Sequence, residues 1–173
     1  VLPKIIDGTH TAGAVTVATA THNLFSEIDA TDITTMMAAL PKYALRTAKF
    51  YCSQVCYSMV FSRLMQAAGG NTISDLMAGA QLQYMGYPVE ISQSMPDCVA
   101  TDYDVLDMML FGDMSMAARL GNRRGMTVAQ STDRYFDTDE IAIRGTERFD
   151  INVHDLGDTS TAGPVVALIG SSS

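Results

Sequence analysis

The feature that most constrains the fold is a strict alternation of apolar and polar residues from Phe149 to His154. Successive side chains of a β-strand point to opposite faces, so the phenylalanine, isoleucine and valine of this segment share one face. The apolar pattern continues upstream through residues 141–143, with an irregularity at Gly145. It therefore predicts one long strand in this part of the chain.

Further strands are predicted on both sides of the middle of the sequence. The run from Leu106 to Phe111 is apolar except for Asp107 and is short enough to be a buried strand, closed by Gly112-Asp113. Weaker patterns predict strands at residues 48–52, 89–92, 127–130 and 164–169, and one or two weak strands in 1–23.

Two helices are predicted in the first half of the chain. The first has apolar residues at helical spacing from Ile33 to Leu40, is capped by Thr31 or Asp29, and ends before Pro41. The second follows Ser53 and ends at Gly69-Gly70. Its apolar stripe consists of Val55, Met59, Phe61, Leu64, Met65 and Ala68. Since the helices precede most of the strands, the order favours an α+β fold over a doubly wound α/β sheet.

The composition is that of a folded, acidic protein. With 173 residues, 47% hydrophobic and 17% charged, the chain is not disordered and can form one domain or two lobes. The net charge is −8 and the basic residues are scattered, with Arg123-Arg124 as the one adjacent pair, so we expect no nucleic-acid-binding stripe. No apolar run approaches the roughly 20 residues of a membrane span, and no signal-peptide pattern is present. The first residue is Val1, and we expect a fragment or a processed product.

The residues that could carry chemistry do not form a recognisable site. Three histidines (His10, His22 and His154) and three cysteines (Cys52, Cys56 and Cys98) are spread along the chain, and the Cys52–Cys56 pair has no second pair to complete a zinc site. We expect buried, reduced thiols, and a surface or interface position for His154. The acidic cluster Asp137, Asp139 and Glu140 does not fit a calcium loop and is interpreted as a solvated turn. We therefore expect no catalytic residues, no metal ligands and no cofactor.

An ordered set of motifs resembles the major capsid proteins of tailed phages. Residues 84–96 read YMGYPVEISQSMP, similar to the family's G-x-P-V, S and M-P stretch, and Leu110 to Asp113 resembles its F-G-D turn. The segment from Arg144 to Asp150 is similar to an R-x-x-E-R strand, and residues 164–168 to its P-V-V-A-L ending. Upstream, residues 33–46 resemble a helix ending in L-P-x-x-Y, and residues 48–70 a strand–helix–glycine unit.

This resemblance implies the Hong Kong 97-type capsid fold, with an axial and a peripheral domain. It places residues 30–115 in the axial domain, and residues 1–29 and 116–173 in the peripheral domain. The family's extended N-terminal arm, long β-hairpin loop and spine helix lie upstream of these motifs, and we find none of them in the sequence. The chain is therefore expected to be the C-terminal portion of a capsid protein. No motif identifies a covalent cross-linking pair.

The function implied is that of a structural, non-enzymatic subunit of a phage or prophage icosahedral shell. Such subunits form pentamers and hexamers, work with scaffold or portal proteins, and enclose DNA without sequence-specific binding. The contact loops expected are residues 71–81 and 96–104. The virion capsid is the expected location, with the host cytoplasm before assembly and no membrane. Two alternatives remain: an encapsulin-like compartment shell, and a hydrolase using Cys52 or Cys98 with a histidine.

Overall fold

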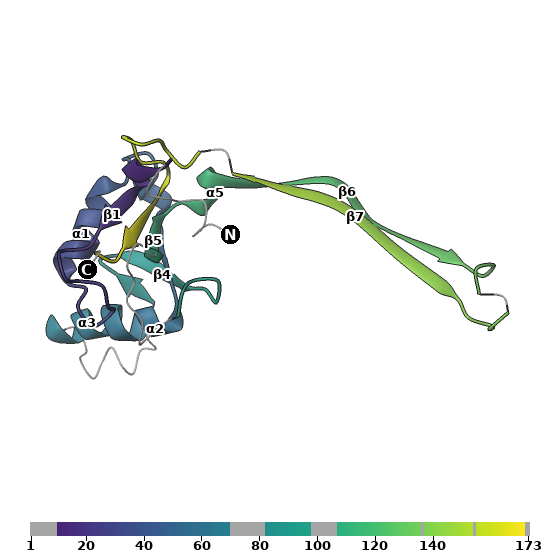
Figure 1. Cartoon of the computed structure of the whole chain (residues 1–173), viewed down its shortest axis with the longest axis horizontal. Coiled ribbons are helices and arrows are strands. Elements are labelled where there is room, and N and C mark those ends of the chain that lie inside the picture. Colours follow the sequence, from purple (N-terminus) through teal and green to yellow (C-terminus); the bar gives the residue numbers. More distant parts are fainter. Residues whose placement is uncertain (1–9, 70–81, 98–106, 136, 154, 172–173) are drawn as a thin grey trace. The chain divides into compact units, whose positions relative to one another are not determined.

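The computed structural model describes residues 10–69, 82–97, 107–135, 137–153 and 155–171. The chain divides into two compact units, the first formed by residues 1–117 and 155–173 and the second by residues 118–154 (Figure 1). The expected contact loops, residues 71–81 and 96–104, lie outside the described residues apart from Pro96 and Asp97.

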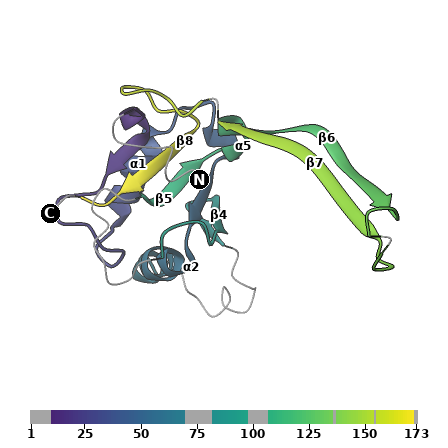
Figure 2. The ribbon, with the colours of Figure 1, turned by 45° about the vertical axis from the view of Figure 1, so that its right-hand side comes forward.

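The first unit is built on a six-stranded mixed sheet in the order β1-β8-β5-β2-β4-β3 (Figure 2). Its strands are β1 (Val15–Val17), β2 (Lys49–Cys52), β3 (Gln83–Tyr84), β4 (Tyr87–Ile91), β5 (Asp107–Gly112) and β8 (Val165–Ile169). The pairs β1–β8 and β2–β4 are parallel, whereas β5 runs antiparallel to both of its neighbours, β2 and β8. Every residue of β5 and β8 is buried, as continuous apolar runs require. The predicted strands of this unit are confirmed.

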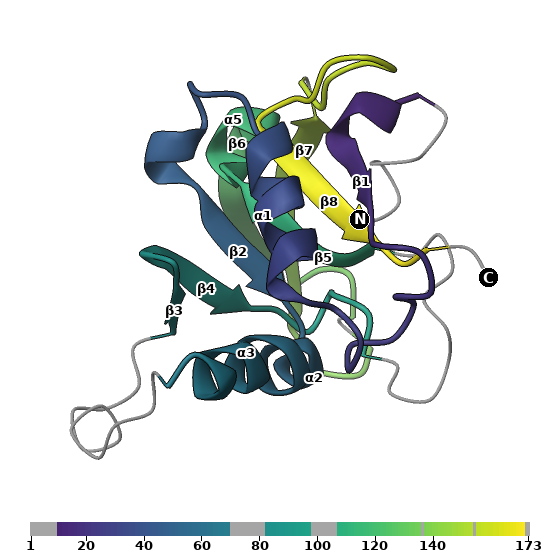
Figure 3. The same cartoon turned by 90° about the vertical axis from the view of Figure 1, so that its left-hand side faces the viewer.

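Helix α1 (Ala30–Ala39) lies against β1 and β8 (Figure 3). Asp29 is the N-cap, and its carboxylate accepts hydrogen bonds from the backbone N–H groups of Thr31 and Asp32. The predicted helix is thus confirmed, with Asp29 and not Thr31 as the cap. It ends at Leu40, because the following proline has no N–H to donate.

The second predicted helix is also present but is not a regular α-helix. It comprises α2 (Gln54–Cys56), a π-helical segment (Tyr57–Ser62) and α3 (Arg63–Ala67), with Ser53 as the N-cap. Of the expected apolar stripe only Phe61 is fully buried, while Val60 is buried without having been predicted. Cys56 is buried as expected for the thiols, although it was not placed in the stripe. The wider π turn rotates the side chains relative to 3.6-residue spacing, so a purely α-helical periodicity selects the wrong face. Three further short elements lie in the described part of this unit: Ala12–Ala14 and Leu45–Thr47, which are 3₁₀ turns, and α5 (Met114–Ala117).

Phe50 of β2 lies at the centre of an aromatic core between the sheet and this helix. Its ring centroid lies 4.4 Å from that of Phe111, 5.3 Å from that of Phe61 and 6.0 Å from that of Tyr84. Offset and edge-to-face pairs of this kind add specific attraction to the burial of apolar area. They fix the second helix against β2, β3 and β5.

The second unit is a long antiparallel hairpin of β6 (Ala118–Ser131) and β7 (Ala142–Val153). Figure 1 shows the two strands side by side along their length. Both strands were predicted in part, and β7 is the long strand expected from the alternation. Strand β6 begins nine residues before its predicted start at Thr127. This hairpin follows the helices of the first unit, so it is not the upstream hairpin loop that the sequence was expected to lack.

The division into units differs from the expected domain boundaries. Residues 155–173 belong to the first unit, whereas the resemblance grouped them with residues 116–154. The cause is the pairing of β8 with β5 and β1, which returns the C-terminal strand to the central sheet. How the two units relate to the axial and peripheral domains stays a prediction.

Candidate functional site

His22, Asp29 and Asp32 form the one group of metal-ligand types found among the described residues. Nδ1 of His22 lies 2.7 Å from one carboxylate oxygen of Asp32, and the backbone N–H and hydroxyl of Thr19 donate to the other. The backbone N–H of Asp29 also donates to Asp32. Both oxygens of Asp32 therefore accept hydrogen bonds that hold the segment before α1 against its first turn. We interpret the group as structural.

The described cysteines are not placed for nucleophilic catalysis. Cys52 and Cys56 are both fully buried. A hydrogen bond with Cys52 and burial raise the pKa of the Cys56 thiol well above its usual value, which is the opposite of what an attacking thiolate requires. Cys98 and His154 lie outside the described residues, and His10 is exposed near the start of them.

The acidic cluster near the hairpin turn lies in solvent. Asp137, Asp139 and Glu140 are exposed, and backbone N–H groups of this segment donate to the carbonyl of Tyr135. The interpretation as a solvated turn is therefore confirmed for these residues.

An open groove of about 670 Å³ crosses the first unit beside β2. Lys49 forms an exposed ion pair with Glu90 at 2.8 Å, and Asp113 accepts hydrogen bonds from the side chains of Thr47 and Ser115. These bonds lower the pKa of Asp113 and hold the start of α5. The acidic side chains here are committed to structural bonds, and the groove offers no activated nucleophile with a neighbouring base among the residues that line it.

The hairpin strands are exposed along almost their whole length. Apart from Ala118, Ala142 and Val153, every described residue of β6 and β7 is exposed. The register pairs Leu120 with Ile151, and Val128 with Gly145. Because paired residues share a face, large apolar side chains of both strands lie on the same side of the hairpin, which we call the apolar face. It consists of Leu120, Met126, Val128, Ile143, Phe149 and Ile151, exposed by 60–74%.

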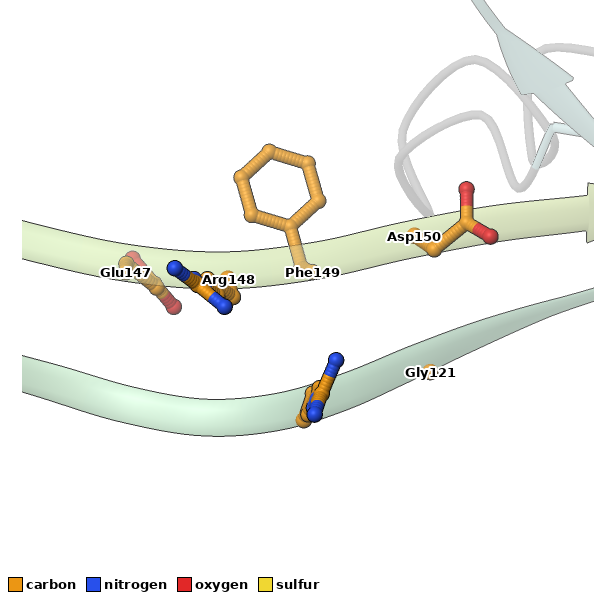
Figure 4. A pocket seen from close by; sticks show the side chains of 6 residues that line it. Gly121, Glu147, Arg148, Phe149 and Asp150 are labelled. Carbon is orange, nitrogen blue, oxygen red and sulfur yellow. The ribbon is translucent and has the colours of Figure 1, made fainter.

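Figure 4 shows part of this hairpin, where Gly121 and Arg148 border a shallow depression across the strands. The ring of Phe149 stands clear of its strand in this view. Exposed aromatic and aliphatic side chains that follow one another along a strand are rare in a monomeric surface and mark a surface that another surface covers.

The opposite side of the hairpin is basic. Arg124 is paired directly with Arg148, while Arg144 is opposite Ala129 and Arg119 opposite Asn152. Arg144 and Arg148 alternate along β7 with Phe149 and Ile151 and so lie on the side away from the apolar face. Arg119 and Arg124 share that side, because each is paired with a β7 residue that lies on it. We call these four arginines the arginine face. The strand pairing thus gathers basic residues that are scattered in the sequence into a local patch. The expectation of no nucleic-acid-binding stripe stays a prediction.

Neither face was predicted as a site. The alternation of β7 did signal an apolar face, but a half-buried strand was the natural reading of that pattern. The arginines could have been recognised only with the register, since β6 carries bulges between Asn122 and Arg124 and between Arg124 and Thr127 that shift residues from one face to the other.

No helix in the described part of the chain is long and apolar enough to cross a membrane.

Comparison with solved structures identifies the fold. The capsid of a native GTA particle matches with a TM-score of 0.63 and 20% identity over 91% of this chain and 49% of that chain. The capsid of an empty GTA particle matches with a TM-score of 0.57 and 18% identity over 91% of this chain and 50% of that one. This chain therefore has the mixed α+β fold of a capsid protein and spans about half the length of both matched chains. A comparison with curated proteins found no match.

The sequence itself supports the same assignment over most of its length. The Phage capsid family matches residues 4–156, which include both the sheet strands β1 to β5 and the whole hairpin. The resemblance drawn from the short motifs is thus confirmed, and this chain belongs to the phage capsid family.

Proposed function

We propose that the chain is a structural, non-enzymatic subunit of a phage or prophage icosahedral capsid shell. Its copies would assemble into pentamers and hexamers that enclose the genome, with scaffold or portal proteins as further partners. The virion capsid would be its final location, reached from the host cytoplasm.

The observation that carries this proposal is the apolar face of the hairpin. A two-stranded hairpin is at best marginally stable in water, because it buries too little apolar area to offset the entropy of ordering its residues. Here β6 and β7 are 14 and 12 residues long and leave six large apolar side chains exposed. Such a ribbon gains its stability when another protein surface covers it, as in a shell whose subunits share interfaces.

The charge and the buried thiols agree with a structural role. The chain carries −8 overall, so most of its surface repels DNA and would leave an enclosed genome loosely held. Cys52 is as deeply buried as Cys56, which leaves the described thiols no access to a substrate. The encapsulin-like alternative has no observation of its own in this chain.

Electron microscopy of the complete gene product tests the proposal. We expect closed shells, or pentameric and hexameric rings, from the unchanged protein. Phe149→Gln together with Ile151→Gln removes apolar area from the hairpin and should reduce assembly, whereas Tyr43→Gln, at an exposed position of the first unit, should not. A gene product that stays monomeric at every concentration, or one that catalyses a reaction lost in Cys52→Ala, would overturn the proposal.

A further inference from the structure

Two arginines of the arginine face repel one another across the hairpin strands. Arg124 and Arg148 are direct cross-strand neighbours, and like charges directly opposite one another destabilise a strand pair. Among the described residues, no carboxylate lies within ion-pairing distance of either arginine. Asp150 is the one acidic residue on this face, and it is paired with Gly121.

The charge distribution along the chain indicates what would relieve this repulsion. The two hairpin strands hold five of the 11 basic residues but only two of the 19 acidic ones, Glu147 and Asp150. The turn between these strands adds Arg134 and four carboxylates, and the chain outside residues 118–154 has 13 carboxylates against five basic side chains. A second copy of the chain thus offers an excess of carboxylates, including the exposed Asp137, Asp139 and Glu140 of its turn, to the basic strands of the first.

The geometry of the face suits carboxylates. Arg144, Arg148 and the position opposite Arg119 follow one another at intervals of four residues on β7, which corresponds to roughly 13 Å at the rise of an extended strand. Each guanidinium can bind a carboxylate through two parallel N–H bonds, and its planar group loses less rotamer entropy for each hydrogen bond formed than a lysine does. Phosphate would satisfy the same donors, but the acidity of the remaining chain opposes the approach of DNA.

We propose that the arginine face, Arg119, Arg124, Arg144 and Arg148, is a docking surface for the carboxylate-rich surface of a second copy of this chain. The inference rests on the proposed function, because it assigns one of the contacts between shell subunits. The two sides of the hairpin then make different contacts. The apolar face is buried against a neighbouring surface, and the arginine face forms ion pairs.

Sedimentation velocity of the 173-residue chain tests the inference. We expect concentration-dependent association at about 50 mM NaCl that weakens at about 500 mM, since salt screens exposed charges. Arg124→Glu with Arg148→Glu should weaken the association roughly ten-fold or more by placing like charges at the contact. Arg46→Glu with Arg134→Glu, which changes the net charge equally but lies off this face, should change it by less than about three-fold.

A milder pair, Arg124→Gln with Arg148→Gln, guards against loss of the hairpin, whose strand content is checked by circular dichroism. It should weaken association less than the glutamate pair does. Equal effects of the face variants and the control pair would overturn the inference, as would an unchanged chain that never associates. It would also be overturned if the face variants lost binding to a duplex DNA probe while associating normally.

The result is separable from the proposed function. Shells that form equally well from the unchanged gene product and from its Arg124→Glu/Arg148→Glu variant would leave the capsid role standing and remove the arginine face from it. Failure of the unchanged gene product to assemble would instead count against the capsid role.

Discussion

Nδ1 of His22 lies 2.7 Å from the buried carboxylate of Asp32, and this contact ties the segment after β1 to the first turn of α1. Burial alone would raise the pKa of Asp32, but hydrogen bonds from Thr19, His22 and the backbone of Asp29 outweigh it and lower the pKa. We expect Asp32→Ala to lower the free energy of unfolding by about 2 kcal/mol or more, because it leaves these donors without an acceptor.

The pH dependence of this effect has a definite sign. A carboxyl whose pKa is lower in the folded than in the unfolded chain stabilises the fold above its unfolded pKa of 3.8, and that contribution disappears as the pH falls through the folded value. The difference between Asp32→Ala and the unchanged chain should therefore shrink in urea titrations below about pH 4. Asp137→Ala, an exposed carboxylate, is the control and should leave stability unchanged. A constant difference across this range would contradict the prediction.

Asp107 should show the opposite behaviour. It is the first residue of β5, is only 6% exposed, and burial raises its pKa to about 7. One of its carboxylate oxygens has no hydrogen-bond partner among the described residues. Folding then favours the protonated form, so stability from this residue is fully present below the unfolded pKa of 3.8 and is lost as the pH rises through the folded value of about 7.

Asp107→Asn removes the cost of burying that charge. Each pKa unit corresponds to about 1.4 kcal/mol, and we expect a gain on the order of 2 kcal/mol at pH 8. Little or no gain is expected near pH 4. Thermal unfolding of both proteins at the two pH values measures it, and an equal change at both would show that the carboxyl is not ionised at a cost in the native state.

Gly112 is a position where the backbone excludes any other residue. Its φ is +147°, and an added Cβ would lie 2.2 Å from the carbonyl oxygen of Pro164. Gly112→Ala should therefore cost about 3 kcal/mol or more, since both the strain and a clash with the β8 backbone oppose it. Gly86→Ala is the matched control: its φ of +82° is also strained, but the added Cβ meets nothing within 4 Å, so we expect a cost of about 1 kcal/mol. Chemical denaturation compares the two, and equal costs would refute the role of the Pro164 contact.

The thiols of Cys52 and Cys56 should be inert in the native protein. Both are fully buried, and reaction with a thiol reagent requires exposed thiolate. In a Cys98→Ser background we expect labelling by an aromatic disulfide reagent to follow the rate of unfolding, and to become rapid in urea. Fast labelling in native buffer would show that this part of the core opens locally.

The central sheet was the most predictable part of the protein. The apolar run ending at Phe111 became a fully buried strand, and the helix from Ala30 to Ala39 was recognised from its cap and spacing. These signals are local. A strand buried on both faces has a continuous apolar run, and a helix buried along one stripe has apolar residues at helical spacing. The prediction failed where geometry departed from regular spacing, as in the π-helical segment Tyr57–Ser62.

The hairpin surfaces could not be derived in the same way. Assigning Arg124 and Arg148 to one face requires the pairing of β6 with β7 and the bulges in β6, neither of which has a local signature. Alternation of apolar and polar residues usually indicates a strand whose apolar face is buried in its own domain. Phe149 is exposed instead. The pairing of β6 with β7 and the exposure of the apolar face both depend on residues far apart in the chain. The local sequence pattern therefore does not predict them.

The position of β8 between β1 and β5 affects how the protein can be made. The ribosome releases β1 and β5 long before β8, with the whole hairpin translated in between. Until Val165–Ile169 emerges, the hydrogen-bonding edge of β5 stays open and the first strand has no place to dock. A growing chain at this stage presents an unpaired apolar strand edge, which is the kind of surface that chaperones bind and that aggregates. The sheet can therefore be completed only after the whole hairpin has been synthesised.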